Sequence, residues 1–177
     1  MWASKAKLGI AWPGWATFGW IILAMVTCRS AAMAYNRIAD RDIDALNPRT
    51  KMRAIPAGLL SLKQVKLFFF ASCGLFIFAA AMLNPLAFAL SPVALLVTLG
   101  YSLTKRFTPL CHFVLGLGLG IAPAAAWIAV TGTLHPVIGW ATFAVMFWTA
   151  GFDIIYALQD EEFDSEKGLR SLPQTLG

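Results

Sequence analysis

Three long stretches without a charged residue limit what this chain can fold into. Positions 8–28, 67–104 and 107–152 contain no Asp, Glu, Lys or Arg. The second stretch has 38 residues and the third has 46, and each can hold two helices that cross a bilayer with a break between them. With 59% hydrophobic residues, the chain is also too apolar for a water-soluble domain. It is therefore predicted to be an integral membrane protein.

Breaks inside the apolar stretches divide them into separate spans. Asn84-Pro85 interrupts the second stretch, and a segment with Gly and Pro at 131–136 interrupts the third. We expect every span to be helical, because lipid offers no partner for an unpaired backbone group. The predicted fold class is thus an all-α, polytopic transmembrane bundle. Its expected spans cover roughly 14–35, 67–83, 86–103, 112–131 and 137–158.

The basic residues predict how this bundle lies in the membrane. Eleven of the 14 Lys and Arg residues fall in segment 36–66, at 105–106 and in the C-terminal tail, on one side of the predicted spans. Such loops stay in the cytoplasm, which predicts a protein of the cytoplasmic membrane with its acidic segments facing the cytoplasm. A nucleic-acid partner is not expected, because acids are mixed with the basic residues of these loops.

The first acidic segment directly follows the first span. Asn36, Asp40 and Asp44 stand four residues apart, so on a helix they point into one cavity. Mg²⁺ commonly takes one or two carboxylates together with phosphate oxygens. One interpretation is therefore a site for Mg²⁺ and a diphosphate. The other is a solvated helix end, with Arg37 and Arg41 paired to the acids.

A second acidic segment follows the last span. Asp153, Asp160 and Asp164 are seven and four residues apart, again on one helix face. Tyr156 is expected on the same stripe, where its hydroxyl can orient a carboxylate or a diphosphate oxygen. Asp153 falls inside the predicted span, where an unpaired carboxylate is costly. It therefore needs a ligand or a basic partner.

Arg29 lies seven residues before the first acidic segment and is expected to face the same cavity. Its planar fork can pair with Asp153, as Arg106 can, or can bind an acidic group on a ligand. Further positive residues follow the first acidic segment at Arg49 and Arg53, and Lys105 stands next to Arg106. Beside an anion site these groups fit diphosphate binding; the alternative is simple cytoplasmic charge.

The cysteines and histidines carry less information. Cys28, Cys73 and Cys111 occur singly, which indicates packing residues and no metal–thiolate site. His112 and His135 stand at span ends, where interface or loop positions are expected rather than catalysis.

These motifs resemble those of the UbiA superfamily of intramembrane prenyltransferases. The Asn-x-x-x-Asp-x-x-x-Asp at 36–44 is similar to the family's first aspartate-rich motif, and the Asp-x-x-Tyr-x-x-x-Asp-x-x-x-Asp at 153–164 is similar to its second. The stretch 49–58 resembles the loop after the first motif, and 101–107 resembles the family's Tyr-x-x-x-Lys-Arg segment. The resemblance implies about nine helices around a central cavity. Residues 1–177 are thus expected to be one domain, truncated at both ends.

The resemblance also implies a reaction, and it is strongest to the 4-hydroxybenzoate polyprenyltransferase branch. A subgroup assigned to menaquinone synthesis by the futalosine route is similar as well. The implied reaction is Mg²⁺-dependent transfer of a polyprenyl group from polyprenyl diphosphate to a ring carbon of an aromatic acid, in ubiquinone or menaquinone biosynthesis. The implied metal ligands are Asn36, Asp40, Asp44, Asp160 and Asp164. The implied diphosphate ligands are Arg49, Arg53, Lys105 and Arg106, and the implied catalytic residues are Arg29, Asp153 and Tyr156.

A cation-coupled transporter that uses intramembrane acids is the competing class. It explains Asp153 and the apolar composition. It does not explain basic residues beside each acidic segment, which a diphosphate site requires.

Overall fold

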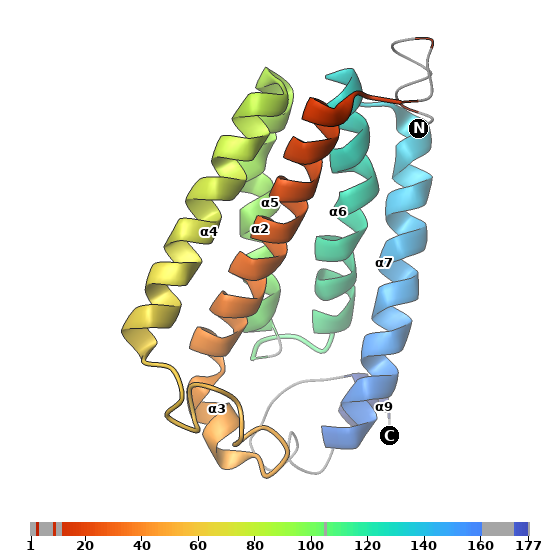
Figure 1. Cartoon of the computed structure of the whole chain (residues 1–177). Helices are drawn as coiled ribbons and strands as arrows, with labels where there is room; N and C mark the ends of the chain where they lie inside the picture. Colours follow the sequence, from red (N-terminus) through yellow and green to blue (C-terminus); the bar gives the residue numbers. More distant parts are fainter. Residues whose placement is uncertain (1–2, 4–8, 10–11, 105, 161–171, 177) are drawn as a thin grey trace.

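A bundle of five long helices makes up most of the structure (Figure 1). The computed structural model describes residues 3, 9, 12–104, 106–160 and 172–176. Within these residues the chain forms helices and no strand, which confirms the all-α prediction. The helices are α2 (Trp15–Ala39), α3 (Arg41–Leu46), α4 (Leu62–Leu83), α5 (Pro85–Thr104), α6 (Cys111–Thr131), α7 (Pro136–Ala157), the 3₁₀ helix η1 (Leu158–Asp160) and α9 (Leu172–Leu176).

Each of the five long helices is long and apolar enough to cross a membrane. They contain 20 to 25 residues, so at 1.5 Å of rise per residue even the shortest covers a bilayer core of roughly 30 Å. Most of their side chains face away from the bundle interior, where lipid would cover them. The five predicted spans are confirmed, although α4 starts earlier and α2 ends later than expected.

Local signals set where these helices begin and end. The Ser61 hydroxyl accepts a hydrogen bond from the Gln64 N–H (3.3 Å), and the Gln64 side chain accepts one from the Ser61 N–H (2.9 Å). This capping box starts α4 ahead of its two lysines, which explains the early start. At the other end of the bundle, Gly132 ends α6 in the left-handed region at φ 69°, and Pro136 begins α7.

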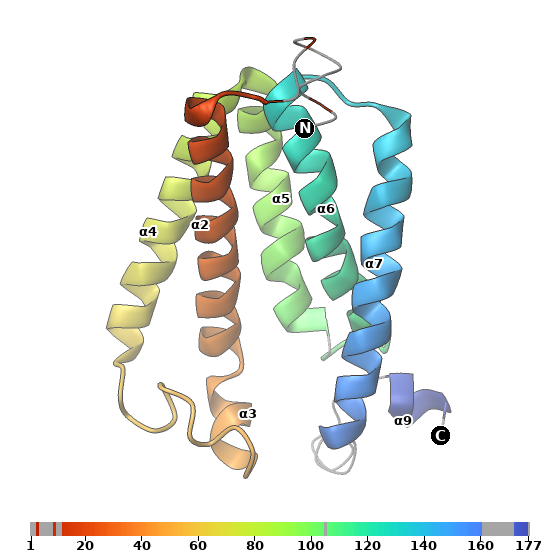
Figure 2. The ribbon, with the colours of Figure 1, turned by 45° about the vertical axis from the view of Figure 1, so that its right-hand side comes forward.

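Two helix pairs dominate the packing. α2 packs on α4 and α6 packs on α7, while α5 contacts α2, α4 and α6. In both views α5 and α6 lie between the α2–α4 pair and α7 (Figure 1, Figure 2). The α6 and α7 backbones approach so closely that a Cβ on Gly116 would lie 2.3 Å from the Met146 carbonyl oxygen, and one on Gly120 would lie 2.6 Å from that of Thr142. These two glycines therefore allow the first half of α6 to pack closely against the middle of α7.

Candidate functional site

The acidic segments of α2 and α7 lie at the same end of the bundle, next to α3 and α9 (Figure 1). The first segment forms two helices, whereas a single helix was expected. α2 ends at Ala39, Asp40 has φ −94° and ψ 1°, and α3 then begins. The N–H of Asp40 still donates to the Asn36 carbonyl (2.9 Å), and that of Asp44 to the Asp40 carbonyl (2.7 Å). The four-residue repeat of the motif thus survives the bend.

Asp40 is buried in a polar cluster and is only 2% exposed. The Asn36 side-chain amide donates to its Oδ2 at 3.0 Å. Arg106, from the connection between α5 and α6, places Nη2 3.9 Å from Asp40 Oδ1 and donates to the Ala39 carbonyl at 2.6 Å. The structure therefore brings one predicted diphosphate ligand next to the first acidic segment.

Asp44 is the second buried carboxylate, at 4% exposure. Arg53 donates from Nη1 to its Oδ1 at 2.6 Å, and the Thr50 hydroxyl donates to its backbone carbonyl at 3.1 Å. These two hydrogen bonds, one to the Asp44 carboxylate and one to its backbone, thus hold the loop after α3 against Asp44. Arg49, by contrast, is exposed, and its N–H donates to the Asn47 side chain.

Two facing atoms of this cluster lack hydrogen bonds within the described residues. They are Asp44 Oδ2 and Arg37 Nη1, both buried and 3.9 Å apart. Leaving buried charged atoms in this state is costly, unless a bound group completes their contacts. A phosphate oxygen would satisfy the guanidinium, and Mg²⁺ would satisfy the carboxylate, whose oxygens are the donors this ion prefers.

The residues present therefore fit Mg²⁺ together with a diphosphate. Among the described residues, however, three or more His, Cys, Asp or Glu side chains do not gather into a complete metal site. Two carboxylates are sufficient on the protein side, because Mg²⁺ usually keeps waters and takes phosphate oxygens for the rest of its shell.

The structure describes the second acidic segment only as far as Asp160. α7 ends at Ala157 and continues as the 3₁₀ helix η1 as far as Asp160, so the α-helical period expected from Asp153 does not extend to Asp160. Tyr156 is 61% exposed, and in the part of the chain that the structure describes it forms no hydrogen bond to a carboxylate. Lys105 and Asp164 lie outside the described residues, as does the side chain of Asp160.

Asp153 has a partner that the sequence analysis did not foresee. Its Oδ2 lies 2.7 Å from Nδ1 of His112, the second residue of α6. Neither Arg29 nor Arg106, which the sequence analysis offered as possible partners, pairs with Asp153 among the described residues, and His112 lies in the first turn of α6 rather than in a loop. The sequence did contain a signal for this pair. One uncharged span begins with a histidine, and another span contains an acid that needs a partner.

Arg29 is exposed at its position on α2 and forms no hydrogen bond or ion pair with another described residue. It nevertheless belongs to the same region, because the half-buried side chain of Tyr101 on α5 experiences the charges of Arg29, Asp40 and Asp153 together. Charged groups of α2 and α7 thus act on one side chain of α5.

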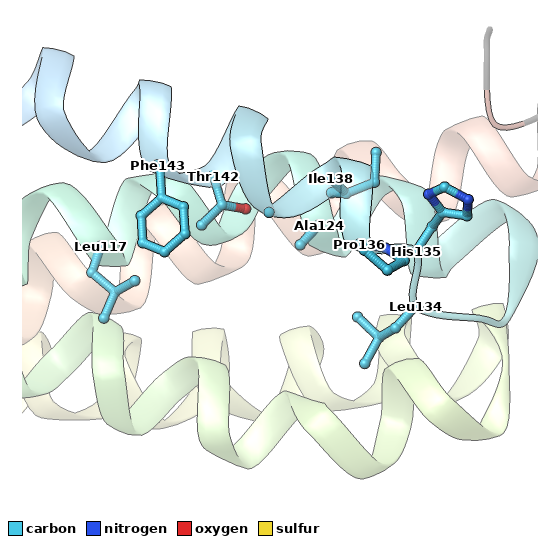
Figure 3. Close-up of a pocket in the computed structure, with 9 residues that line it drawn as sticks. Leu117, Ala124, Leu134, His135, Pro136, Ile138, Thr142 and Phe143 are labelled. Atoms are coloured by element: carbon cyan, nitrogen blue, oxygen red, sulfur yellow. The ribbon is translucent and has the colours of Figure 1, made fainter.

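A separate apolar groove of about 470 Å³ lies between α6 and α7, at the end of the bundle away from the acids (Figure 3). It lacks the charged groups of the candidate site. Its lining residues are Leu117, Ala124, Leu134, His135, Pro136, Ile138, Gly139, Thr142 and Phe143.

Comparison with known families identifies this architecture. The profile of the UbiA prenyltransferase family matches residues 3–177. The chain belongs to the UbiA prenyltransferase family. The resemblance seen in the two acidic motifs is thereby confirmed, and membership favours a transferase over a transporter.

Individual relatives of this UbiA family chain agree with the assignment. It is 38% identical over 157 residues to a 4-hydroxybenzoate octaprenyltransferase of Shewanella sediminis, covering 88% of this chain and 54% of that protein. It is 34% identical over 181 residues to the enzyme of the same name from Vibrio atlanticus, covering 100% of this chain and 63% of that protein. The chain thus spans little more than half the length of these relatives.

Solved structures of UbiA homologues share the fold. The apo structure of a homologue from Aeropyrum pernix superposes with a TM-score of 0.87 at 38% identity, covering 93% of this chain and 62% of that one. A homologue from Archaeoglobus fulgidus, bound to DMAPP and Mg²⁺, superposes with a TM-score of 0.72 at 23% identity, covering 93% and 59%. The helix arrangement is therefore that of the UbiA fold.

Proposed function

We propose that the protein transfers a polyprenyl group from polyprenyl diphosphate to a ring carbon of an aromatic acid such as 4-hydroxybenzoate, as a step of quinone biosynthesis. The observation that carries the proposal is the pair of buried carboxylates, Asp40 and Asp44, surrounded by arginines at one end of a membrane bundle. The names of the Shewanella and Vibrio relatives support the substrates.

The diphosphate is proposed to bind at the acidic end of the bundle. Arg37, Arg53 and Arg106 already stand within 3.9 Å of a buried carboxylate, and their guanidinium groups suit phosphate oxygens. Arg49 and Lys105 are proposed as further ligands. When bound, Mg²⁺ neutralises diphosphate charge; it would be held by Asn36, Asp40 and Asp44, and by Asp160 and Asp164 of the second segment.

The reaction proposed for this site breaks the bond between the prenyl carbon and the diphosphate oxygen. The arginines stabilise the negative charge that the leaving diphosphate gains, and fixed charges act strongly where the bilayer excludes water. The ring carbon of the acceptor then bonds to the allylic cation, and the ring loses a proton. The apolar prenyl chain is expected to lie in the membrane-embedded part of the bundle.

The acceptor is proposed to bind between the two acidic segments, near Tyr101. Arg29, without an ion pair among the described residues, is the candidate for its carboxylate. Asp153 on α7 and Tyr156 are proposed to act on the opposite side of the acceptor. A naphthoate-type acceptor would use the same groups and would place the protein in menaquinone rather than ubiquinone biosynthesis.

The test uses the full-length protein in nanodiscs, with radiolabelled polyprenyl diphosphate, 4-hydroxybenzoate and Mg²⁺. We expect a lipid-soluble aromatic product that disappears with a chelator and falls at least about 100-fold in Asp40→Asn, because this change removes a carboxylate that would hold the Mg²⁺ neutralising the diphosphate. Asp42→Asn is the matched control: its side chain is 83% exposed and pairs with Arg41, so product should persist.

If product forms with a naphthoate acceptor but not with 4-hydroxybenzoate, the proposed prenyl transfer stands and the pathway is menaquinone rather than ubiquinone biosynthesis. Absence of diphosphate release with every acceptor, or equal activity in the two variants, would contradict the proposal.

A further inference from the structure

We propose that His112 is the positioning residue for Asp153, and that the His112–Asp153 pair forms the wall of the acceptor site that recognises the acceptor's hydroxyl group. This inference rests on the proposed function. It begins with the location of the pair, which joins the start of α6 to the end of α7 through the 2.7 Å contact between Nδ1 and Oδ2.

The two side chains of the pair differ in exposure. The His112 side chain is 4% exposed, whereas that of Asp153 is 36% exposed. A pair that served only to neutralise a buried acid would be enclosed on both sides. Here the imidazole is enclosed and the carboxylate is open, which is the arrangement of a fixed support that presents a group to a ligand.

Hydrogen bonding shows that Nδ1 of His112 carries a proton. The Asp153 carboxylate can only accept, so Nδ1 donates to Oδ2 across the 2.7 Å contact. On the other side of the ring, the Leu172 backbone nitrogen of α9 lies 3.4 Å from Nε2. In the part of the chain that the structure describes, Asp153 Oδ1 has no hydrogen bond, so it can accept one from a ligand hydroxyl.

The helix packing holds this pair in register. His112, Gly116 and Gly120 stand four residues apart on one face of α6, and both glycines lie against the α7 backbone. This close packing restricts sliding of the two helices and so keeps the imidazole and the carboxylate in register. The pair is thus carried by two packed helices rather than by a loop.

The surroundings of Asp153 indicate the kind of ligand. Asp153 Oδ1 can accept a hydrogen bond from a hydroxyl, and the exposed Arg29, which forms no hydrogen bond or ion pair with another described residue, can bind a carboxylate. An aromatic acid with a ring hydroxyl matches both ends: its carboxylate suits Arg29, and its hydroxyl suits Asp153. We therefore infer that Asp153, held in place by His112, selects acceptors that carry a ring hydroxyl group.

The test compares His112→Asn with His112→Gln in the full-length protein. Asn places its amide nitrogen near the position of Nδ1 and keeps a donor for Asp153, whereas Gln places its amide near Nε2. Both variants are polar and similar in size. We expect His112→Asn to retain kcat/KM for the acceptor within about threefold and His112→Gln to lose about tenfold or more, with KM for polyprenyl diphosphate unchanged in both.

The decisive readout is inhibition by two acceptor analogues that differ in the hydroxyl group. One analogue carries the hydroxyl with the reactive ring positions blocked, and the other lacks the hydroxyl. Wild type and His112→Asn should bind the hydroxylated analogue about tenfold more tightly, and His112→Gln should bind the two about equally.

A purely structural role for His112 would weaken both analogues to the same extent and leave their ratio unchanged, which would overturn the inference. Equal ratios in all three proteins would do so as well. If wild type shows no transfer with any acceptor, the proposed function itself fails, so the two failures are distinguishable.

Discussion

At the scale of single residues, the acidic end depends on how each buried carboxylate is paired. Arg53→Gln removes the 2.6 Å partner of Asp44 and leaves Arg37 at 3.9 Å. We expect the free energy of unfolding to fall by about 1–3 kcal/mol, because a buried charge loses its hydrogen bond. Thermal unfolding in detergent measures this change.

Lys51→Gln is the matched control for that change, since Lys51 is exposed in the same loop. Its effect on unfolding should stay within about 0.5 kcal/mol. Equal destabilisation by the two substitutions would show that the loop as a whole, and not the Arg53–Asp44 pair, stabilises this end.

These residues also show what the sequence could and could not predict. Asn36, Asp40 and Asp44 were predictable as a group, because a helical period relates neighbours four positions apart. The partner of Asp153 was not, because His112 lies 41 positions away and no local pattern specifies which helices pack together. The bend at Asp40 was also missed, since the four-residue spacing is the same with or without it.

At the scale of helices, the contact between α6 and α7 depends on glycines, which have no side chain to keep the backbones apart. Gly116→Ala would place a Cβ 2.3 Å from the Met146 carbonyl oxygen. Both atoms belong to rigid helices, so we expect a loss of about 2–4 kcal/mol in stability and of the His112–Asp153 contact. The transfer activity and the temperature of thermal unfolding should decrease together.

Gly118→Ala on the same helix is the matched control. The nearest atom to its Cβ is the Thr98 Cα at 3.6 Å, which is an ordinary contact. Alanine favours the helix over glycine by about 1 kcal/mol, so this variant should be as stable as the wild type or more so. A similar loss in both variants would refute the role assigned to the close α6–α7 approach.

Asn84 joins helices at the other end of the bundle. Its amide donates to the Ile128 carbonyl (2.8 Å) and the Ala129 carbonyl (3.2 Å) of α6, and its Oδ1 accepts from the Ala87 N–H (2.9 Å) of α5. Asn84→Ala should cost about 1–2 kcal/mol in thermal unfolding. Asn84→Ser keeps a cap for α5 and should recover part of this loss; no recovery would mean that the bonds to α6 supply all of it.

At the scale of the whole molecule, the two ends of the bundle differ in chemistry. Arg37, Arg53 and Arg106 gather at the acidic end. Exposed tryptophans, Trp15 and Trp140, lie near the starts of α2 and α7 at the opposite end. Aromatic rings concentrate at membrane interfaces, and basic residues concentrate on the cytoplasmic side, so this polarity extends the charge pattern read from the sequence.

That polarity predicts the orientation in the cell. With Cys28, Cys73 and Cys111 replaced, Asp42→Cys at the acidic end and Thr133→Cys between α6 and α7 give two exposed single-cysteine sites. A membrane-impermeant maleimide should label the Thr133→Cys variant in intact cells and the Asp42→Cys variant in inverted vesicles only, because basic loops remain in the cytoplasm. The reverse labelling would place the acidic site outside, away from cytoplasmic diphosphate and Mg²⁺, and would contradict both the orientation and the proposed supply of substrate.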